Sequence, residues 1–70
     1  MDWDQIGAKW SQFKGSVKQR WGKLTDDDLD YVAGTRDRLV GRLQEKYGIG
    51  KEEAERQADE WFRTHRNPAA

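Results

Sequence analysis

The amino-acid sequence predicts an all-α protein, a small bundle of two helical hairpins with four helices in total. The chain nearly repeats itself, because the segment 13–17, followed by Trp21-Gly22, returns 26 positions later as the segment 39–43, followed by Tyr47-Gly48. Each copy leads into an acidic stretch, and its apolar residues recur every three or four positions. A helix–glycine–helix unit that occurs twice in a short chain predicts two hairpins that cover each other's apolar faces, with pseudo-twofold internal symmetry.

The first helix is expected over residues 3–24. Its apolar residues form one narrow stripe on a helical wheel and stand at positions 3, 6, 10, 13, 17, 21 and 24. Asp2 or Asp4 can accept hydrogen bonds from the first free backbone N–H groups. Gly22 suits the left-handed conformation that commonly ends a helix.

The second helix is short and begins at Thr25, because a Thr followed three residues later by Asp28 is close to a capping box. The carboxylates of residues 26–28 also face the positive end of the helix dipole. Gly34 interrupts this helix after an apolar edge that consists of Leu29, Val32 and Ala33.

The third helix is expected to begin near Thr35 and to end at Gly48. Its apolar side consists of Leu39, Val40, Leu43 and Tyr47. After a turn at residues 49–50, residues 51–53 open the fourth helix. The apolar face of the fourth helix consists of Ala54, Ala58, Trp61 and Phe62, and its C-terminal end carries Arg63, His65 and Arg66.

Residues 1–66 are expected to form a single helical domain, and residues 67–70 a disordered C-terminal tail. Leu, Ile, Val and Phe make up only 11 of the 70 residues, which predicts a thin core and marginal stability. Four Trp and two Tyr offset this shortage, because each aromatic ring buries a large area. The centre of the core is expected to consist of Trp10, Phe13, Val17, Trp21, Leu39, Leu43, Tyr47 and Trp61.

Two glycines lie within the expected helices, away from their apolar stripes. Gly15 and Gly41 should each weaken the helix by about 1 kcal/mol relative to Ala. One interpretation is a softness that permits unfolding or remodelling. The alternative, which we favour, is a close contact with another helix or simple tolerance.

Composition excludes several classes of protein. The chain has no Cys, so it has no disulfide, iron–sulfur cluster or thiol nucleophile. No apolar run approaches the length that spans a bilayer, and the first residues lack the features of a signal peptide. We therefore expect a monomer in the cytoplasm, with no membrane insertion.

No combination of side chains predicts catalysis, a metal site or a bound cofactor. Consecutive Asp residues at 26–28 point in different directions around a helix start, so capping is favoured over calcium binding. His65 is the only histidine and lacks a second ligand at a suitable spacing. Ser11 and Ser16 have no plausible base beside them. We expect a protein that is not an enzyme.

Two basic faces provide an alternative, which is the binding of nucleic acid or of a protein partner. They consist of Lys9, Lys14, Lys18, Arg20 and Lys23 on the first helix, and of Arg36, Arg38, Arg42 and Lys46 on the third. A net charge of zero and a pI near 6.6 count against nucleic acid. The same bases are more simply explained by attraction to the acidic helix starts.

The chain resembles the CsbD-like family of small bacterial general-stress proteins, of the YjbJ type. The resemblance covers roughly residues 3–62, with departures at 49–50 and 63–70. It is carried by residues 10–15, 17–18, 21–28, 34, 36–37, 39–41, 44–48 and 54–55. It implies a compact bundle of two helical hairpins, broadly like sterile-alpha-motif domains, and synthesis under general stress conditions. It supplies no catalytic residues and no biochemical activity.

These observations together favour a non-enzymatic cytoplasmic stress-response protein with a protective or interaction-based role. The alternative is a small regulatory module that binds nucleic acid or a protein through the basic faces of the first and third helices. The sequence identifies neither the partner nor the stress.

Overall fold

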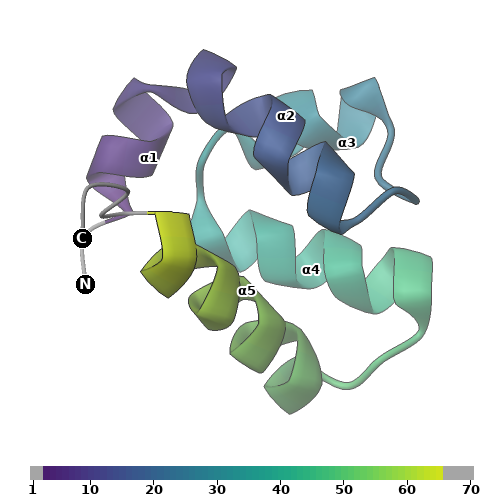
Figure 1. Ribbon diagram of the computed structural model, residues 1–70. Helices are drawn as coiled ribbons and strands as arrows, with labels where there is room; N and C mark the ends of the chain where they lie inside the picture. Colours follow the sequence, from purple (N-terminus) through teal and green to yellow (C-terminus); the bar gives the residue numbers. More distant parts are fainter. Residues whose placement is uncertain (1–2, 66–70) are drawn as a thin grey trace.

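The structure is a computed structural model that describes residues 3–65 (Figure 1). Within this range it contains helices and no strands, which confirms the all-α prediction. The five helices of the described residues are α1 (Asp4–Ala8), α2 (Trp10–Arg20), α3 (Asp26–Val32), α4 (Arg36–Tyr47) and α5 (Lys51–His65). The predicted tail at 67–70 lies outside the described residues, as does the predicted end of the domain at residue 66.

The expected first helix over residues 3–24 is in fact two helices, so the prediction of four helices was wrong. Lys9, with φ −117° and ψ 31°, separates α1 from α2. The change of direction brings α1 against the turn between α3 and α4, where a methyl group placed on Gly34 would lie 2.4 Å from the Cα atom of Gly7. This contact and the burial of Ile6 outweigh the continuity of the amphipathic stripe, which Gly7 already weakens.

The two glycines expected to end helices behave differently. Gly48 has φ 64° and caps α4 in the left-handed conformation, as predicted. The prediction for Gly22 was wrong, because positive φ angles among the described residues occur only at positions 33, 34 and 48. Helix α2 ends at Arg20, and Trp21 leaves the helix with its ring buried and its indole N–H donating to Gln57 Oε1 at 2.9 Å.

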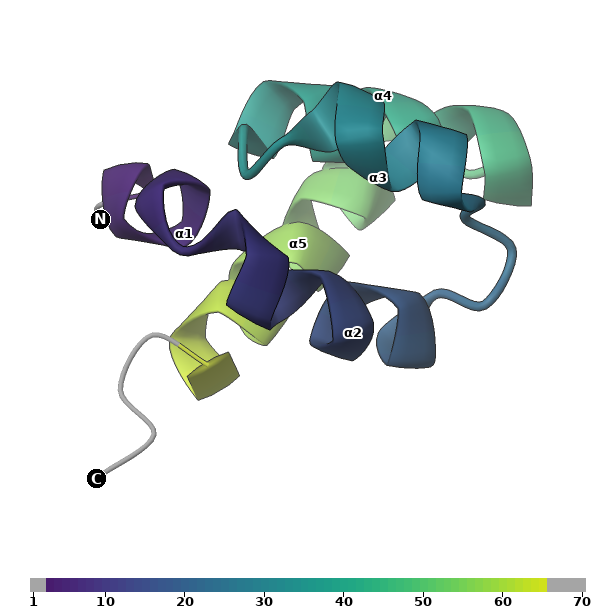
Figure 2. The ribbon, with the colours of Figure 1, turned by 90° about the horizontal axis from the view of Figure 1, so that it is seen from above.

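Helix α4 lies between α3 and α5 and packs against both (Figure 1). Seen from above, α3 runs alongside α4, and α1 lies at one end of the molecule (Figure 2). Lysine side chains of α2 reach across to aspartates of α3. The arrangement as two hairpins with pseudo-twofold symmetry, like the likeness to sterile-alpha-motif domains, stays a prediction.

The core contains most of the residues predicted for it. Its buried hydrophobic members are Ile6, Val17, Trp21, Leu24, Leu29, Val32, Leu39, Val40, Leu43, Ala54, Ala58, Trp61 and Phe62. Three residues predicted at its centre, Trp10, Phe13 and Tyr47, are instead half-buried at its edge. Two of them have polar groups that find partners there. The indole N–H of Trp10 donates to a backbone carbonyl oxygen, and the hydroxyl of Tyr47 accepts from a backbone N–H.

Gly15 and Gly41 are exposed, and a methyl group on either would meet no atom within 4 Å. The prediction that they stand away from the packed faces is confirmed, and close contact with another helix is excluded as their reason. None of the helices between residues 3 and 65 has both the length and the apolar character needed to cross a membrane.

Candidate functional site

The acidic start of α3 is a helix cap and an electrostatic centre. Thr25 Oγ1 accepts from the backbone N–H of Asp28 at 3.2 Å, and Asp28 Oδ2 accepts from that of Thr25 at 2.9 Å, which completes the predicted capping box. Asp28 is only 5% exposed, and its carboxylate also lies 3.3 Å from Lys46 Nζ and 3.6 Å from Arg42 Nε. It therefore ties α3 to α4.

The pKa of Asp28 is held below its ordinary value, mainly by the hydrogen bond from the Thr25 backbone and also by Lys46, although burial acts to raise it. A carboxylate stabilised in this way does not need a metal ion. Nowhere in residues 3–65 do three or more His, Cys, Asp or Glu side chains gather as metal ligands would.

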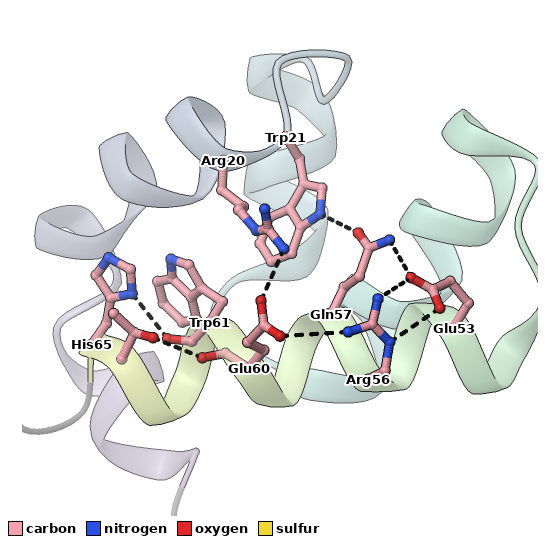
Figure 3. Close-up of polar contacts among 9 residues, drawn as sticks. Arg20, Trp21, Glu53, Arg56, Gln57, Glu60, Trp61 and His65 are labelled. Carbon is pink, nitrogen blue, oxygen red and sulfur yellow. Dashed lines mark hydrogen bonds and ion pairs between the residues drawn. The ribbon is translucent and has the colours of Figure 1, made fainter.

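His65 is half-buried and packs on a tryptophan. The His65 ring stacks on Trp61 with centroids 4.7 Å apart, and its Nδ1 lies 2.9 Å from the Trp61 carbonyl oxygen (Figure 3). Ser11 is exposed on α2, and Ser16 is half-buried on the same helix. None of the described hydrogen bonds joins either serine to His65. The expectation that there is no catalytic site stays a prediction.

The basic face of α2 turns its long side chains to acidic partners on other helices. Lys14 Nζ lies 3.1 Å from Asp30, and Lys18 Nζ lies 3.2 Å from Asp26. Both partners belong to α3, so the two helices are joined by a row of ion pairs. The Lys18–Asp26 pair confirms the predicted attraction of these bases to an acidic helix start.

The basic face of α4 is used in the same way. Arg36 forms two hydrogen bonds with Asp59 of α5, from Nε at 2.7 Å and from Nη2 at 3.0 Å. This fork geometry is the strong form of an arginine–carboxylate pair. The hydrogen bond lowers the pKa of Asp59 and raises that of Arg36. Arg42 and Lys46 both approach Asp28.

Six of the nine bases proposed for nucleic-acid binding are therefore in ion pairs within the molecule: Lys14, Lys18, Arg20, Arg36, Arg42 and Lys46. Two others lie against tyrosine rings, with Lys23 Nζ 5.2 Å from the centroid of Tyr47 and Arg38 Cζ 5.0 Å from that of Tyr31. A base that already neutralises a carboxylate attracts a phosphate less strongly. The geometry therefore gives the nucleic-acid alternative little support.

The polar face of α5 carries a chain of hydrogen bonds and ion pairs (Figure 3). Arg56 binds Glu53 at 2.6 Å and Glu60 at 3.4 Å, and Glu60 in turn meets Arg20 of α2 at 3.4 Å. Gln57 continues the chain, because its amide donates to Glu53 and its carbonyl oxygen accepts from the indole N–H of Trp21, the residue after α2. The hydrogen bonds from Arg56 and Gln57 lower the pKa of Glu53 to about 2. This is a solvated face that also fixes α2 on α5.

An aromatic cluster surrounds Trp61 in the interior of the molecule. Its ring lies 5.9 Å from that of Trp3, 5.8 Å from that of Phe13 and 6.4 Å from that of Trp21, measured between centroids. Trp3 also stacks on Phe62 at 4.8 Å with an interplanar angle of 20°. Rings at these separations pack favourably beyond their buried area. The rings of this cluster therefore pack in the core or against it.

One surface feature was missed from the sequence. Tyr31 is 46% exposed and is the one exposed large hydrophobic side chain among residues 3–65. The guanidinium groups of Arg38 and Arg42 lie over its ring, at 5.0 and 4.3 Å from the centroid. Tyr31 lies two residues after Leu29, and that spacing alone places it on the opposite side of the helix.

These features define a small all-α protein whose charged side chains are largely paired with one another and whose core combines aliphatic residues with an aromatic cluster. The family model described as CsbD-like matches residues 4–56 of this chain. The UPF0337 protein YjbJ of Escherichia coli strain K12 is 52% identical over 61 residues, which is 87% of this chain and 88% of that relative. A UPF0337 protein of Rhodopseudomonas palustris is 55% identical over 64 residues, covering 91% of this chain and 97% of the relative.

The chain therefore belongs to the CsbD-like family, as the resemblance indicated. A further relative, a UPF0337 protein of Pectobacterium atrosepticum, is 53% identical over 66 residues, or 94% of this chain and 96% of its own. The names of these relatives state no activity, and the matched model indicates no catalytic family.

Proposed function

We propose that this protein is a non-enzymatic protective protein of the cytoplasm, which accumulates under general stress and limits the loss of other proteins. The observation that supports this proposal best is the internal pairing of its charges. The surface carries many charged groups of both signs, 13 basic and 13 acidic in the whole chain. Interspersed charges keep a surface hydrated, and a net charge of zero avoids strong attraction to nucleic acid or anionic membranes.

The scarcity of exposed apolar surface supports the same proposal. Among the described residues, Tyr31 is the one exposed large hydrophobic side chain, and two guanidinium groups cover part of its ring. A protein without a large apolar patch can reach a high concentration without associating with itself. We accordingly propose that it is a monomer. Membership of the CsbD-like family supports the link to stress.

The test is to dry or heat a labile enzyme with this protein, or with an inert protein of equal mass concentration. We expect a larger fraction of the enzyme activity to survive with this protein. Equal loss of activity in both samples would remove the protective role. Pull-down from stressed and unstressed cells would then identify any partner that an interaction-based role requires.

A further inference from the structure

Helix α1 depends on the surface beneath it. A helix of five residues is too short to be stable alone, so its helical state relies on packing. Its flanking Trp3 stacks on Phe62 of α5, and Ile6 is 1% exposed. We name the surface beneath α1 the α1 seat: it consists of Trp61, Phe62 and Gly34.

The polar groups at this contact are poorly matched. The indole N–H groups of Trp3 and Trp61 are both buried, and neither has an acceptor within residues 3–65. A buried donor without a partner is costly, whereas the same donor in water is satisfied. Separation of α1 from the seat would allow water to reach the indole N–H of Trp3. The contact thus combines favourable ring packing with an unfavourable polar term.

The connection to α2 allows α1 to move as a unit. Lys9 has non-helical backbone angles and is the single residue between α1 and α2. Figures 1 and 2 show α1 at one end of the molecule, while α4 packs against α3 and α5. Ion pairs join α2 to α3 and α5. A change in the backbone angles of one residue can therefore swing α1 away while the remaining helices stay packed.

We propose that α1 detaches reversibly from the α1 seat, and that the exposed seat then binds an apolar segment of a partly unfolded protein. The inference rests on the protective function proposed above and names the surface that carries it. The fitting segment resembles α1 itself: it presents an aromatic residue and a branched aliphatic residue three positions apart, as Trp3 and Ile6 do. Such binding is a form of helix-in-groove recognition.

A single substitution, which we call the wedge variant, is expected to release α1. In Gly34→Ala the new methyl group would lie 2.4 Å from Gly7 Cα and 2.7 Å from Gly7 N, and these backbone atoms can move away only with α1. Gly48→Ala is the matched control. Both glycines are left-handed, with φ 79° and 64°, but a methyl group on Gly48 meets no atom within 4 Å. The control therefore also places Ala at a positive φ, but without the close contact.

Amide hydrogen exchange of the full-length variants tests release. We expect residues 5–9 to exchange about tenfold faster in Gly34→Ala than in Gly48→Ala, with equal exchange in α4 and α5. Equal exchange of residues 5–9 in the two variants would overturn the proposal that α1 detaches. Binding is measured with reduced and carboxymethylated α-lactalbumin, a permanently unfolded chain. We expect at least threefold tighter binding by the wedge variant than by its control, and equal binding would overturn the role of the seat.

Should Gly34→Ala unfold as a whole, the wild-type protein provides the decisive measurement. A synthetic peptide of residues 3–9, in excess, should displace the unfolded chain from the wild-type protein. The same peptide with serine at both apolar positions should not. Failure of the first peptide to compete would overturn the inference. Protection of the labile enzyme by the wild type would still stand in that case, so the two proposals can fail separately.

Discussion

Asp28 offers the sharpest test of how the structure uses charge. Replacement by Ala removes the acceptor of the capping box and the acidic partner of Lys46 and Arg42. Replacement by Asn keeps an oxygen that can accept from the Thr25 N–H but removes the charge. The two variants therefore separate the cap from the ion pairs. Asp27→Asn is the control, because Asp27 lies beside Asp28 and is exposed.

The expected magnitude follows from the contacts. Asp28→Ala keeps the cap formed by the Thr25 hydroxyl but loses the hydrogen bond from the Thr25 N–H to the carboxylate, which contributes about 1 kcal/mol. The side chains of Lys46 and Arg42 are 34% and 27% exposed, so each partly screened pair contributes about 0.5–1 kcal/mol. We expect Asp28→Ala to lower the free energy of unfolding by about 2–3 kcal/mol. For a domain of this size that corresponds to a fall in Tm of about 10–20 °C. Asp28→Asn should cost about 1–2 kcal/mol, and the Asp27 control no more than about 0.5 kcal/mol.

The pH dependence gives a second check with a definite sign. The pKa of Asp28 is lower in the folded protein than its ordinary value of 3.8. Its contribution to stability is therefore present above the ordinary pKa and is lost as the pH falls through the lowered folded value. Urea unfolding followed by tryptophan fluorescence, at neutral and acidic pH, measures both effects. A cost below about 0.5 kcal/mol for Asp28→Ala, or the same acid dependence in wild type and Asp28→Asn, would refute the reasoning.

Three further predictions follow from backbone and surface geometry. Ala33→Gly should raise the free energy of unfolding by about 0.5–1 kcal/mol in urea unfolding, because Ala33 is exposed and adopts φ 47°. Gly15→Ala and Gly41→Ala should each raise it by about 0.5–1 kcal/mol, since both glycines are exposed within helices with open space around them; a decrease would mean that the glycine is needed. The wild type should show no salt-sensitive retention of DNA in filter binding, and reversal of Lys14 and Lys18 to Glu should leave that result unchanged, because both already face carboxylates.

Periodicity in the sequence was enough to predict the helices that pack along their whole length. Helix α5 buries Ala54, Ala58, Trp61 and Phe62, the four residues assigned to its apolar face. The capping box at Thr25 was also predictable, because its two partners are three residues apart. These features depend on local spacing, and local spacing is visible in one sequence.

The division between α1 and α2 was not predictable in this way. The stripe from residue 3 to residue 24 is compatible with one straight helix, and only the contact between Gly7 and Gly34 shows why the chain bends instead. Those glycines are 27 positions apart, so no local pattern connects them. Gly7 within a helical stretch was the available signal, because an interior glycine weakens a helix. Trp21 likewise leaves α2 to reach Gln57, a partner on a distant helix.

The candidate surfaces, too, were predictable only as far as local spacing shows them. The basic stripes of α2 and α4 could be seen in the sequence, but their partners could not, since ion pairs such as Arg36–Asp59 join residues from different helices. Once these pairs are known, the repeated alternation of basic and acidic segments has a structural explanation. Each basic helix lies beside an acidic one, so the charges fix the order of packing in a chain with few large aliphatic residues. Charge pairing at the surface is weak for each pair and sensitive to salt. A fold that depends on many such pairs around a thin core will therefore lose stability as the salt concentration rises.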